Sequence, residues 1–231
     1  AFIDSDAYPE KNWIANSLTV LENKKDIYII GGPNISPEQQ DFQRTIIGEV
    51  QKSFLITGKW SFQKRLSASR FSENLYSCNM IMLKSTYIKN HGMNESLKTG
   101  EDYDFCNKIN DNKKRIFFNQ NSIVYHYDRN FKNFFIQKLV RGSTVIDQIK
   151  LKSKLYKDKI AEFYFYQLMP LYFIIFLILS SLILMNFIYC PFFIKTLIKI
   201  LYFSYFILVI YSLRHVEKKN IIYFLLIIFF V

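Results

Sequence analysis

A long apolar stretch is the feature that most constrains how this chain can fold. Residues 163–189 contain no charged side chain and are dominated by Phe, Ile, Leu and Tyr. The stretch is longer than the roughly 20 apolar residues that a helix needs to cross a bilayer. We therefore predict a transmembrane helix at 163–189.

Two further apolar segments follow. Residues 192–213 are long enough for a second transmembrane helix, in which Lys195 and Lys199 could extend toward the nearer membrane interface or face a protein partner. Residues 221–231 are too short to cross a bilayer alone. We expect them to be part of a third span or an interfacial segment.

Positive charge gathers beside these apolar segments. The chain has a formal net charge of +11, which by itself would suit a nucleic-acid-binding protein. Basic clusters, however, stand where cytoplasmic loops of membrane proteins carry positive charge. They are Lys150, Lys152, Lys154, Lys157 and Lys159, and then Arg214, Lys218 and Lys219. We therefore expect no nucleic-acid partner, but a multi-pass protein of the cell membrane with residues 1–150 in the cytoplasm and a basic juxtamembrane segment at 151–162.

The cysteines and the first residue give two smaller indications. Cys78, Cys106 and Cys190 have no paired spacing, which is typical of a protein in a reducing compartment. Ala1 lies inside a predicted strand, so we expect further residues of the full-length protein to precede it.

The first 150 residues alternate apolar runs with stretches of helical periodicity. An apolar run at 1–3 precedes a helical pattern from Trp13 to Leu21, and a second run at 27–30 is closed by Gly31-Gly32-Pro33. Further strands are expected at 79–83, 115–118 and 123–125, and further helices at 37–54 and after Gly100. This alternation is typical of an α/β domain.

Two carboxylates follow the first apolar run. Asp4 and Asp6 would extend from the carboxyl edge of a sheet, where open α/β folds bind their ligands. Such hard oxygen donors suit Mg²⁺ or Mn²⁺ held between the protein and a diphosphate. The alternative is an acidic turn that caps the following helix.

A second acidic pair opens a later helix. Glu101 and Asp102 follow Gly100, and a carboxylate there could act as a general base if the fold brings it beside a reacting hydroxyl. The alternative is helix capping, because Thr99 and Asp102 resemble a capping box. His126 ends the strand at 123–125 and is a candidate for a metal or phosphate contact, although a lone histidine is more often structural.

The order and spacing of these motifs resemble the family 2 glycosyltransferases, whose fold is called GT-A. The apolar run with Asp4-Ser5-Asp6-Ala7 resembles the family's strand and D-x-D-A motif, and Gly31-Gly32-Pro33-Asn34 resembles its later glycine-containing loop. The other matches are Asn79, His91-Gly92-Met93-Asn94-Glu95 with G-G-F-D-E, Gly100-Glu101-Asp102-Tyr103-Asp104 with G-E-D-x-D, and Val124-Tyr125-His126 with V-x-H. His91 and Asn94 depart from the family pattern, and Lys108 stands near where the family often has Arg.

The resemblance covers about residues 1–145 and implies a partial GT-A domain, a mixed sheet with flanking helices, followed by transmembrane helices. It implies an inverting glycosyltransferase that moves a sugar from a nucleotide-diphosphate donor to an acceptor hydroxyl. Asp4, Asp6 and His126 would hold Mg²⁺ or Mn²⁺ on the diphosphate. Asp102, with Glu101 beside it, would be the general base, and Asp104, Asn79 and Trp60 would line the substrate site.

The resemblance also bears on what lies outside this chain. The family's first βαβ half, which holds the base and ribose of the donor, would precede Ala1, so the chain alone is expected to be inactive. The expected acceptor is a glycan or lipid-linked sugar at a bacterial inner membrane.

Two alternatives stay open. A processive polysaccharide synthase would carry Q-x-x-R-W, whereas Gln137 and Arg141 stand one residue too far apart and lack the Trp. A non-catalytic membrane scaffold would be favoured if the full-length protein showed no metal-dependent turnover of a nucleotide sugar.

Overall fold

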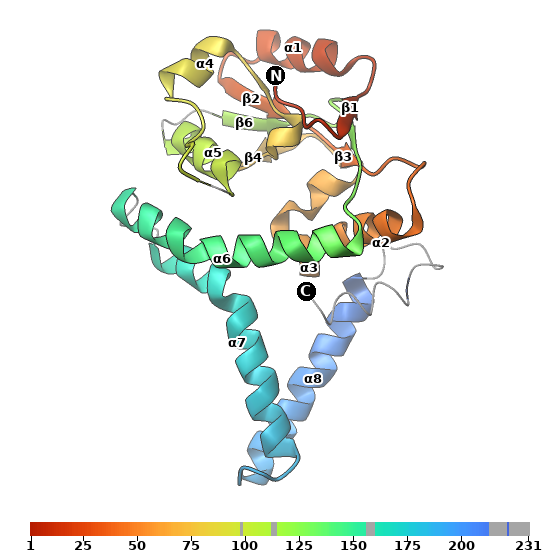
Figure 1. The fold of residues 1–231 in the computed structure, drawn as a ribbon, viewed down its shortest axis with the longest axis vertical. Coiled ribbons are helices and arrows are strands. Elements are labelled where there is room, and N and C mark those ends of the chain that lie inside the picture. Colours follow the sequence, from red (N-terminus) through yellow and green to blue (C-terminus); the bar gives the residue numbers. More distant parts are fainter. Residues whose placement is uncertain (98, 112–114, 156–159, 213–220, 222–231) are drawn as a thin grey trace. The chain divides into compact units, whose positions relative to one another are not determined.

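The computed structural model describes residues 1–97, 99–111, 115–155, 160–212 and 221 (Figure 1). The chain forms two compact units that divide inside helix α6 (Phe131–Leu155), between Lys138 and Leu139. The first unit is a mixed α/β domain with two small sheets and flanking helices, and the second contains two long apolar helices.

The first unit is built from short elements. Its strands are β1 (Ala7–Pro9), β2 (Ile27–Gly31), β3 (Asn34–Ile35), β4 (Arg70–Ser72), β5 (Ile81–Met82), β6 (Arg115–Phe118) and β7 (Val124–His126). Its helices are α1 (Trp13–Asn23), α2 (Phe42–Gln51), α3 (Phe54–Thr57), α4 (Lys84–Lys89) and α5 (Glu101–Asp111), the 3₁₀ helices η1 (Gly58–Lys64) and η2 (Ser77–Asn79), and the start of α6.

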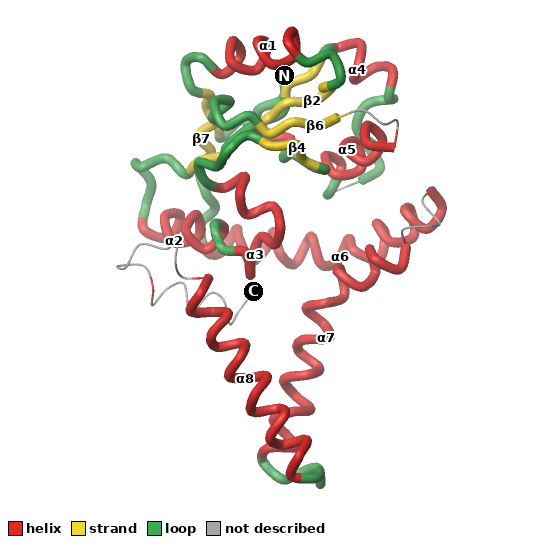
Figure 2. The backbone as a smooth tube through the Cα atoms, turned by 180° about the vertical axis from the view of Figure 1, so that it is seen from behind, coloured by secondary structure: helices red, strands yellow, loops and turns green. Residues whose placement is uncertain are grey.

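The larger sheet has the strand order β4-β6-β2-β5 and carries the core on both faces. Strands β2 and β6 are parallel, whereas β4 and β5 run antiparallel to their neighbours. Helix α1 lies along one face and α5 along the other (Figures 1 and 2). Ile29 packs in the cluster with Phe105 of α5, while Ile27 and Ile30 pack with Val20 of α1. The central strand is therefore buried on both sides, as its uninterrupted apolar sequence predicts.

The smaller sheet has the order β1-β7-β3 and sets the geometry of the candidate site. Strand β1 pairs antiparallel with β7, so that Ala7 stands opposite His126. The rings of Tyr8 and Tyr125 stack across this pair with centroids 5.2 Å apart. This register places Asp6, the residue before Ala7, beside the end of β7.

Three expected elements in this unit differ from the structure. The strand expected at 79–83 is limited to β5 (Ile81–Met82), because Asn79 ends the 3₁₀ helix η2. The strand expected at 1–3 is only a bridge, in which Phe2 and Met80 exchange two backbone hydrogen bonds of 2.8 and 3.3 Å. It ends there because the partner segment pairs with β2 from Ile81 onward. The helix expected at 37–54 is shorter in the structure, where α2 begins at Phe42 after the N-cap Asp41 and ends at Gln51. A separate short helix, α3, begins at Phe54 after the N-cap Ser53.

The second unit contains α7 (Ile160–Leu184) and α8 (Phe192–Ser212). Helix α7 ends before the expected residue 189, because Asn186 adopts a left-handed φ of 63°. The N–H groups of Phe187 and Asn186 donate to the carbonyl oxygens of Leu182 and Ile183 at 2.9 and 3.2 Å, the Schellman pattern that closes a helix.

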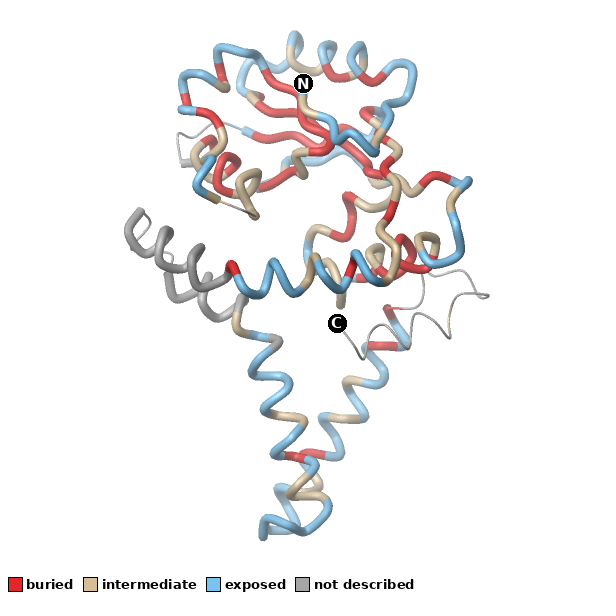
Figure 3. The backbone as a smooth tube through the Cα atoms, viewed as in Figure 1, coloured by how far each residue is buried: buried red, intermediate tan, exposed pale blue. Residues whose placement is uncertain are grey.

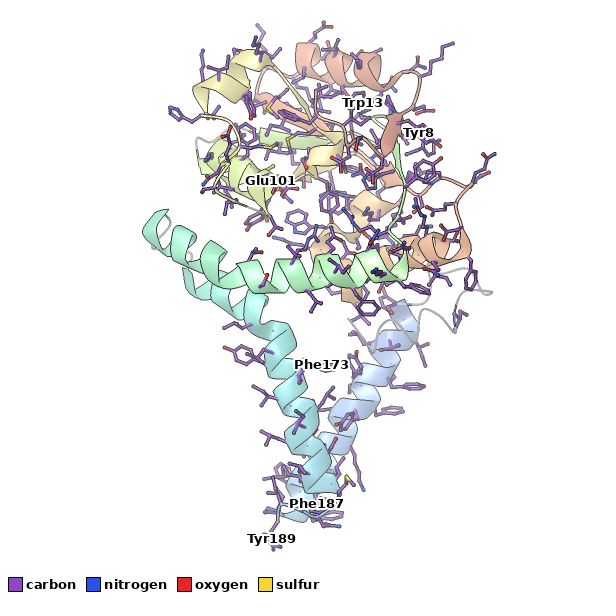
Figure 4. All side chains as sticks on the ribbon, viewed as in Figure 1. Tyr8, Trp13, Glu101, Phe173, Phe187 and Tyr189 are labelled. Carbon is purple, nitrogen blue, oxygen red and sulfur yellow. The ribbon has the colours of Figure 1, made fainter. Side chains whose placement is uncertain are left out.

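The two helices of this unit contact each other and expose many apolar side chains (Figure 3). The hydroxyls of Ser180 and Tyr202 lie 2.8 Å apart. Phe187 and Tyr189 lie in the turn between the helices (Figure 4). Among the described residues, α8 is the helix that is long and apolar enough to cross a membrane, while the apolar part of α7, Leu171–Leu184, is shorter. Apart from Ile221, the segments 213–220 and 221–231 lie outside the described residues.

Candidate functional site

The structure brings the first acidic motif to the histidine at the end of β7. Nε2 of His126 lies 3.3 Å from Oδ2 of Asp4 and 3.3 Å from Oδ1 of Asp6. His126 is buried, with 8% of its side chain exposed, whereas the two carboxylates are 46% and 55% exposed. One side of the cluster therefore faces the protein interior, and the acidic side is open to solvent.

Backbone pairing fixes this arrangement. The N–H of Ala7 donates to the carbonyl oxygen of Asp4 at 3.1 Å and closes a turn around both aspartates. The N–H of Tyr127 donates to the carbonyl oxygen of Asp6 at 3.2 Å and extends the pairing of β1 with β7. Residues 122 positions apart in sequence are thus held together by main-chain hydrogen bonds.

Cys78 completes the cluster, and no motif spacing in the sequence could have revealed it. One ligand atom each from Asp4, Cys78 and His126 lies within 4.8 Å of the others. The thiol of Cys78 donates to Oδ1 of Asn34 at 3.3 Å. Burial raises the pKa of the Cys78 thiol to about 12, and the charges of Asp4 and Asp102 act in the same direction.

Positive charge surrounds the open side of the cluster. The hydrogen bond from His126 is the main cause that lowers the pKa of Asp4, and burial opposes it. The charges of His126, Arg129 and Lys64 lower the pKa further. Lys64 ends η1 and Arg129 follows β7, and neither belongs to a motif that the sequence singled out.

Asn79 holds the segments of the site together. It has no exposed surface, and its Oδ1 accepts the indole N–H of Trp13, labelled on α1 in Figure 4, at 2.9 Å. Its Nδ2 donates to the carbonyl oxygens of Pro33 and Ser122 at 3.1 and 2.9 Å. All of its hydrogen-bonding groups are occupied inside the protein, which favours a positioning role over the expected substrate contact.

Gly31 and Gly32, expected to form a loop, lie against the backbone of Asn79 and Ser122. A Cβ at Gly31 would clash with the carbonyl oxygen of Asn79, and a Cβ at Gly32 would clash with that of Ser122. The loop after β2 therefore approaches both segments as closely as only glycine permits.

Asp102 lies at the start of α5 and contacts the residue before Cys78. Its Oδ2 accepts the backbone N–H of Ser77 at 3.4 Å, and its Oδ1 accepts that of Tyr103 at 2.7 Å. The carboxylate thus contacts η2 next to Cys78, and its charge acts on that thiol as the charge of Asp4 does. Glu101 is half-buried at the same helix start (Figure 4).

The remaining expected site residues lie in the core. Asp104 is fully buried, and its Oδ2 lies 3.2 Å from Nζ of Lys108. Trp60 is half-buried against the core cluster, its ring centroid 6.4 Å from that of Phe62. These contacts give both residues a packing role in this unit, and their expected substrate contacts stay predictions.

The donor set of the cluster fits a divalent cation. It offers two carboxylates, an imidazole nitrogen and a thiol, all of which ligate divalent metals. Nδ2 of Asn34, next to Cys78, is buried and has no hydrogen-bond partner among the described residues. A buried polar atom without a partner indicates that the cluster is not fully satisfied by the protein alone.

No family model, curated protein or solved structure matches the chain. The chemistry of the cluster therefore carries the functional assignment.

Proposed function

We propose that this chain carries the metal-holding and acceptor-activating part of an inverting glycosyltransferase that uses a nucleotide-diphosphate sugar. The observation that carries the proposal is the meeting of Asp4 and Asp6 on Nε2 of His126, each at 3.3 Å. An acidic pair that only capped a helix would have no reason to meet a buried histidine 122 positions away. The resemblance in motif order supports the same assignment.

The donor side of the reaction belongs to the exposed face of this cluster. Asp4, Asp6 and His126 would hold Mg²⁺ or Mn²⁺, which would supply positive charge beside the leaving diphosphate. Lys64 and Arg129, whose charges already act on Asp4, would add positive potential for the same diphosphate. A protein that presents acidic ligands within a basic surrounding suits a metal-bound diphosphate.

The acceptor side belongs to the start of α5. Asp102 would accept the proton of the acceptor hydroxyl as that oxygen attacks the anomeric carbon from the face opposite the leaving group, which inverts the configuration. Glu101 stands beside it at the helix start. The helix dipole favours a negatively charged side chain at this position.

The membrane setting follows from the second unit. Helix α8 is long and apolar enough to cross a bilayer, and basic residues flank the apolar segments in the sequence. We propose a multi-pass anchor, a cytoplasmic first unit where nucleotide sugars are available, and a glycan or lipid-linked acceptor at a bacterial inner membrane.

The proposal is tested by nucleotide release from a panel of nucleotide-diphosphate sugars, with the full-length protein in detergent micelles, Mn²⁺ and a lipid-linked acceptor. Release should require the cation and the acceptor. Asp102→Asn keeps an oxygen that can accept the N–H of Tyr103, so the fold should survive while turnover falls by roughly a hundredfold or more. Near-normal turnover in a folded Asp102→Asn protein would show that Asp102 is a helix cap. No release from any donor would favour a non-catalytic scaffold.

A further inference from the structure

The cluster contains a sulfur ligand that a site for Mg²⁺ does not need. Cys78 lies in η2, next to Asn79, and only 8% of Cys78 is exposed. Its sulfur, a carboxylate oxygen of Asp4 and a ring nitrogen of His126 all lie within 4.8 Å of one another. The thiol is therefore part of the cluster's geometry and lies on its buried side.

The spacing of the ligand atoms suits direct coordination. In a tetrahedral site with metal–ligand bonds of about 2.1 Å, neighbouring oxygen and nitrogen ligands stand about 3.4 Å apart. Asp4 Oδ2 and His126 Nε2 already stand 3.3 Å apart. A thiolate would stand about 3.6 Å from the nitrogen. Because the sulfur lies within 4.8 Å of the nitrogen, it needs to approach by at most about 1.2 Å.

The surroundings of the sulfur provide an independent observation. Asn34 is 2% exposed, and its Oδ1 accepts the S–H of Cys78, while its Nδ2 has no partner among the described residues. A half-turn of this amide would direct Nδ2 at the sulfur, where its N–H would donate to a metal-bound thiolate. The same half-turn would satisfy the unpartnered nitrogen, which is how outer-shell groups support metal ligands.

We propose that Cys78 is a ligand of the divalent cation, together with Asp4 and His126, and that the site takes thiophilic cations of the Zn²⁺, Co²⁺ and Cd²⁺ class in preference to Mg²⁺. Thiolate ligands select against hard cations such as Mg²⁺, and Zn²⁺ and Co²⁺ bind more tightly than Mn²⁺ to mixed nitrogen, oxygen and sulfur sites. Of the two cations expected from the sequence, Mn²⁺ should then bind this site more tightly than Mg²⁺. The exposed Asp6 borders the open side, where a diphosphate oxygen can complete the coordination. The use of the cation in sugar transfer rests on the proposed function, whereas its binding does not.

The test is a titration of the full chain in detergent micelles with Co²⁺ alone, followed by thiolate-to-metal charge-transfer absorption. The wild type and the matched control Cys190→Ser, which removes a cysteine of the second unit, should show the same saturable band. Cys78→Ser should lose the band and bind Co²⁺ at least about tenfold more weakly. Mg²⁺ in large excess should leave the wild-type band intact, and Zn²⁺ should abolish it. A band that survives in Cys78→Ser, or that Mg²⁺ displaces, overturns the proposal.

A second measurement needs no substitution and covers the case in which Cys78→Ser fails to fold. Cadmium NMR of the wild-type chain should give a resonance shifted into the range of sites with one thiolate ligand. A resonance in the range of oxygen and nitrogen sites overturns the proposal. In the full-length protein, the Co²⁺ band without any sugar transfer would refute only the proposed function, whereas sugar transfer without the band would refute only the role of Cys78.

Discussion

Individual carboxylates in this chain have similar sequence surroundings but different contacts. Asp4 and Asp6 open toward solvent beside His126, Asp102 contacts η2, and Asp104 is buried against Lys108. Asp104 has no exposed surface, so a cation or a diphosphate could not reach it without rearrangement of the core, whereas Asp4 and Asp6 are about half exposed. At the residue scale, exposure and neighbours therefore separate a ligand from a structural acid.

This distinction predicts the effect of Asp6→Asn. An amide oxygen is a poorer, uncharged ligand for a divalent cation, so the affinity for Mn²⁺ should fall by roughly tenfold or more while the fold is retained. Calorimetric titration of the full chain with Mn²⁺ measures the change. Asp26→Asn is the matched control, because Asp26 has the same 55% side-chain exposure but pairs with Arg115 at the start of β2. Equal Mn²⁺ affinity in both variants would remove Asp6 from the metal site.

At the scale of elements, a residue with a left-handed backbone conformation closes helix α4. Helix α4 ends at Lys89, and His91, two residues later, has a left-handed φ of 60°. The N–H groups of His91 and Gly92 donate to the carbonyl oxygens of Ile88 and Tyr87 at 3.1 and 3.0 Å, the same closing pattern as at the end of α7. The family that the sequence resembles has glycine at this position, and a left-handed residue without a Cβ costs the least there.

His91→Gly should therefore raise the free energy of unfolding by about 0.5 kcal/mol or more, since the exposed His91 side chain loses no packing. His91→Val should lower it by about 1 kcal/mol, because a β-branched residue resists the left-handed region. Lys89→Gly, two positions earlier in the helix, is the control and should be destabilising. Urea unfolding measures all three, and a stabilising His91→Val would contradict the argument.

Contacts between elements depend strongly on Asn79. Asn79→Leu removes three hydrogen bonds and leaves the indole N–H of Trp13 and the carbonyl oxygens of Pro33 and Ser122 buried without this partner. Each such loss costs about 1–3 kcal/mol, so the free energy of unfolding should fall by roughly 3 kcal/mol or more.

The two tryptophans of the chain, Trp13 and Trp60, both belong to the first unit, so their fluorescence during urea unfolding reports on that unit. Asn16→Ala is the control for Asn79→Leu. It removes one exposed hydrogen bond, from Asn16 to the carbonyl oxygen of Asn121 at 2.7 Å, and should cost about 1 kcal/mol or less. If Asn79→Leu were as stable as the control, the three hydrogen bonds of Asn79 would not hold the site together.

At the scale of the whole molecule, the distribution of charge predicts an orientation in the membrane. A reporter fused after Ser212 should be cytoplasmic, and one inserted between Cys190 and Pro191 should lie outside. Basic residues precede α7 and follow α8 in the sequence, so both of these ends are expected on the cytoplasmic side. A reporter at Ala1 should match the first of these. Cytoplasmic signals at all three positions would show that 163–213 forms a re-entrant or interfacial hairpin.

Local sequence signals determined the elements whose causes are themselves local. The apolar runs of β2 and β6, the start of α8 after Pro191 and the start of α5 after Gly100 all appear where the sequence predicts them. Apolar periodicity and the backbone preferences of Pro and Gly act over a few residues, so a sequence reveals them directly. The end of α7 at Leu184 was missed because Asn186 lies within an otherwise continuous apolar stretch.

Only the tertiary structure decided which polar residues meet. The distance from Asp4 to His126 depends on the register of β1 with β7, and the place of Cys78 depends on an asparagine that hydrogen-bonds to residues 66, 46 and 43 positions away. A carboxylate, an imidazole and a thiol have no periodicity that announces a shared site. Their convergence is set by how the apolar faces of distant strands and helices pack, which is why Cys78 could be placed beside Asp4 and His126 only once the fold was known.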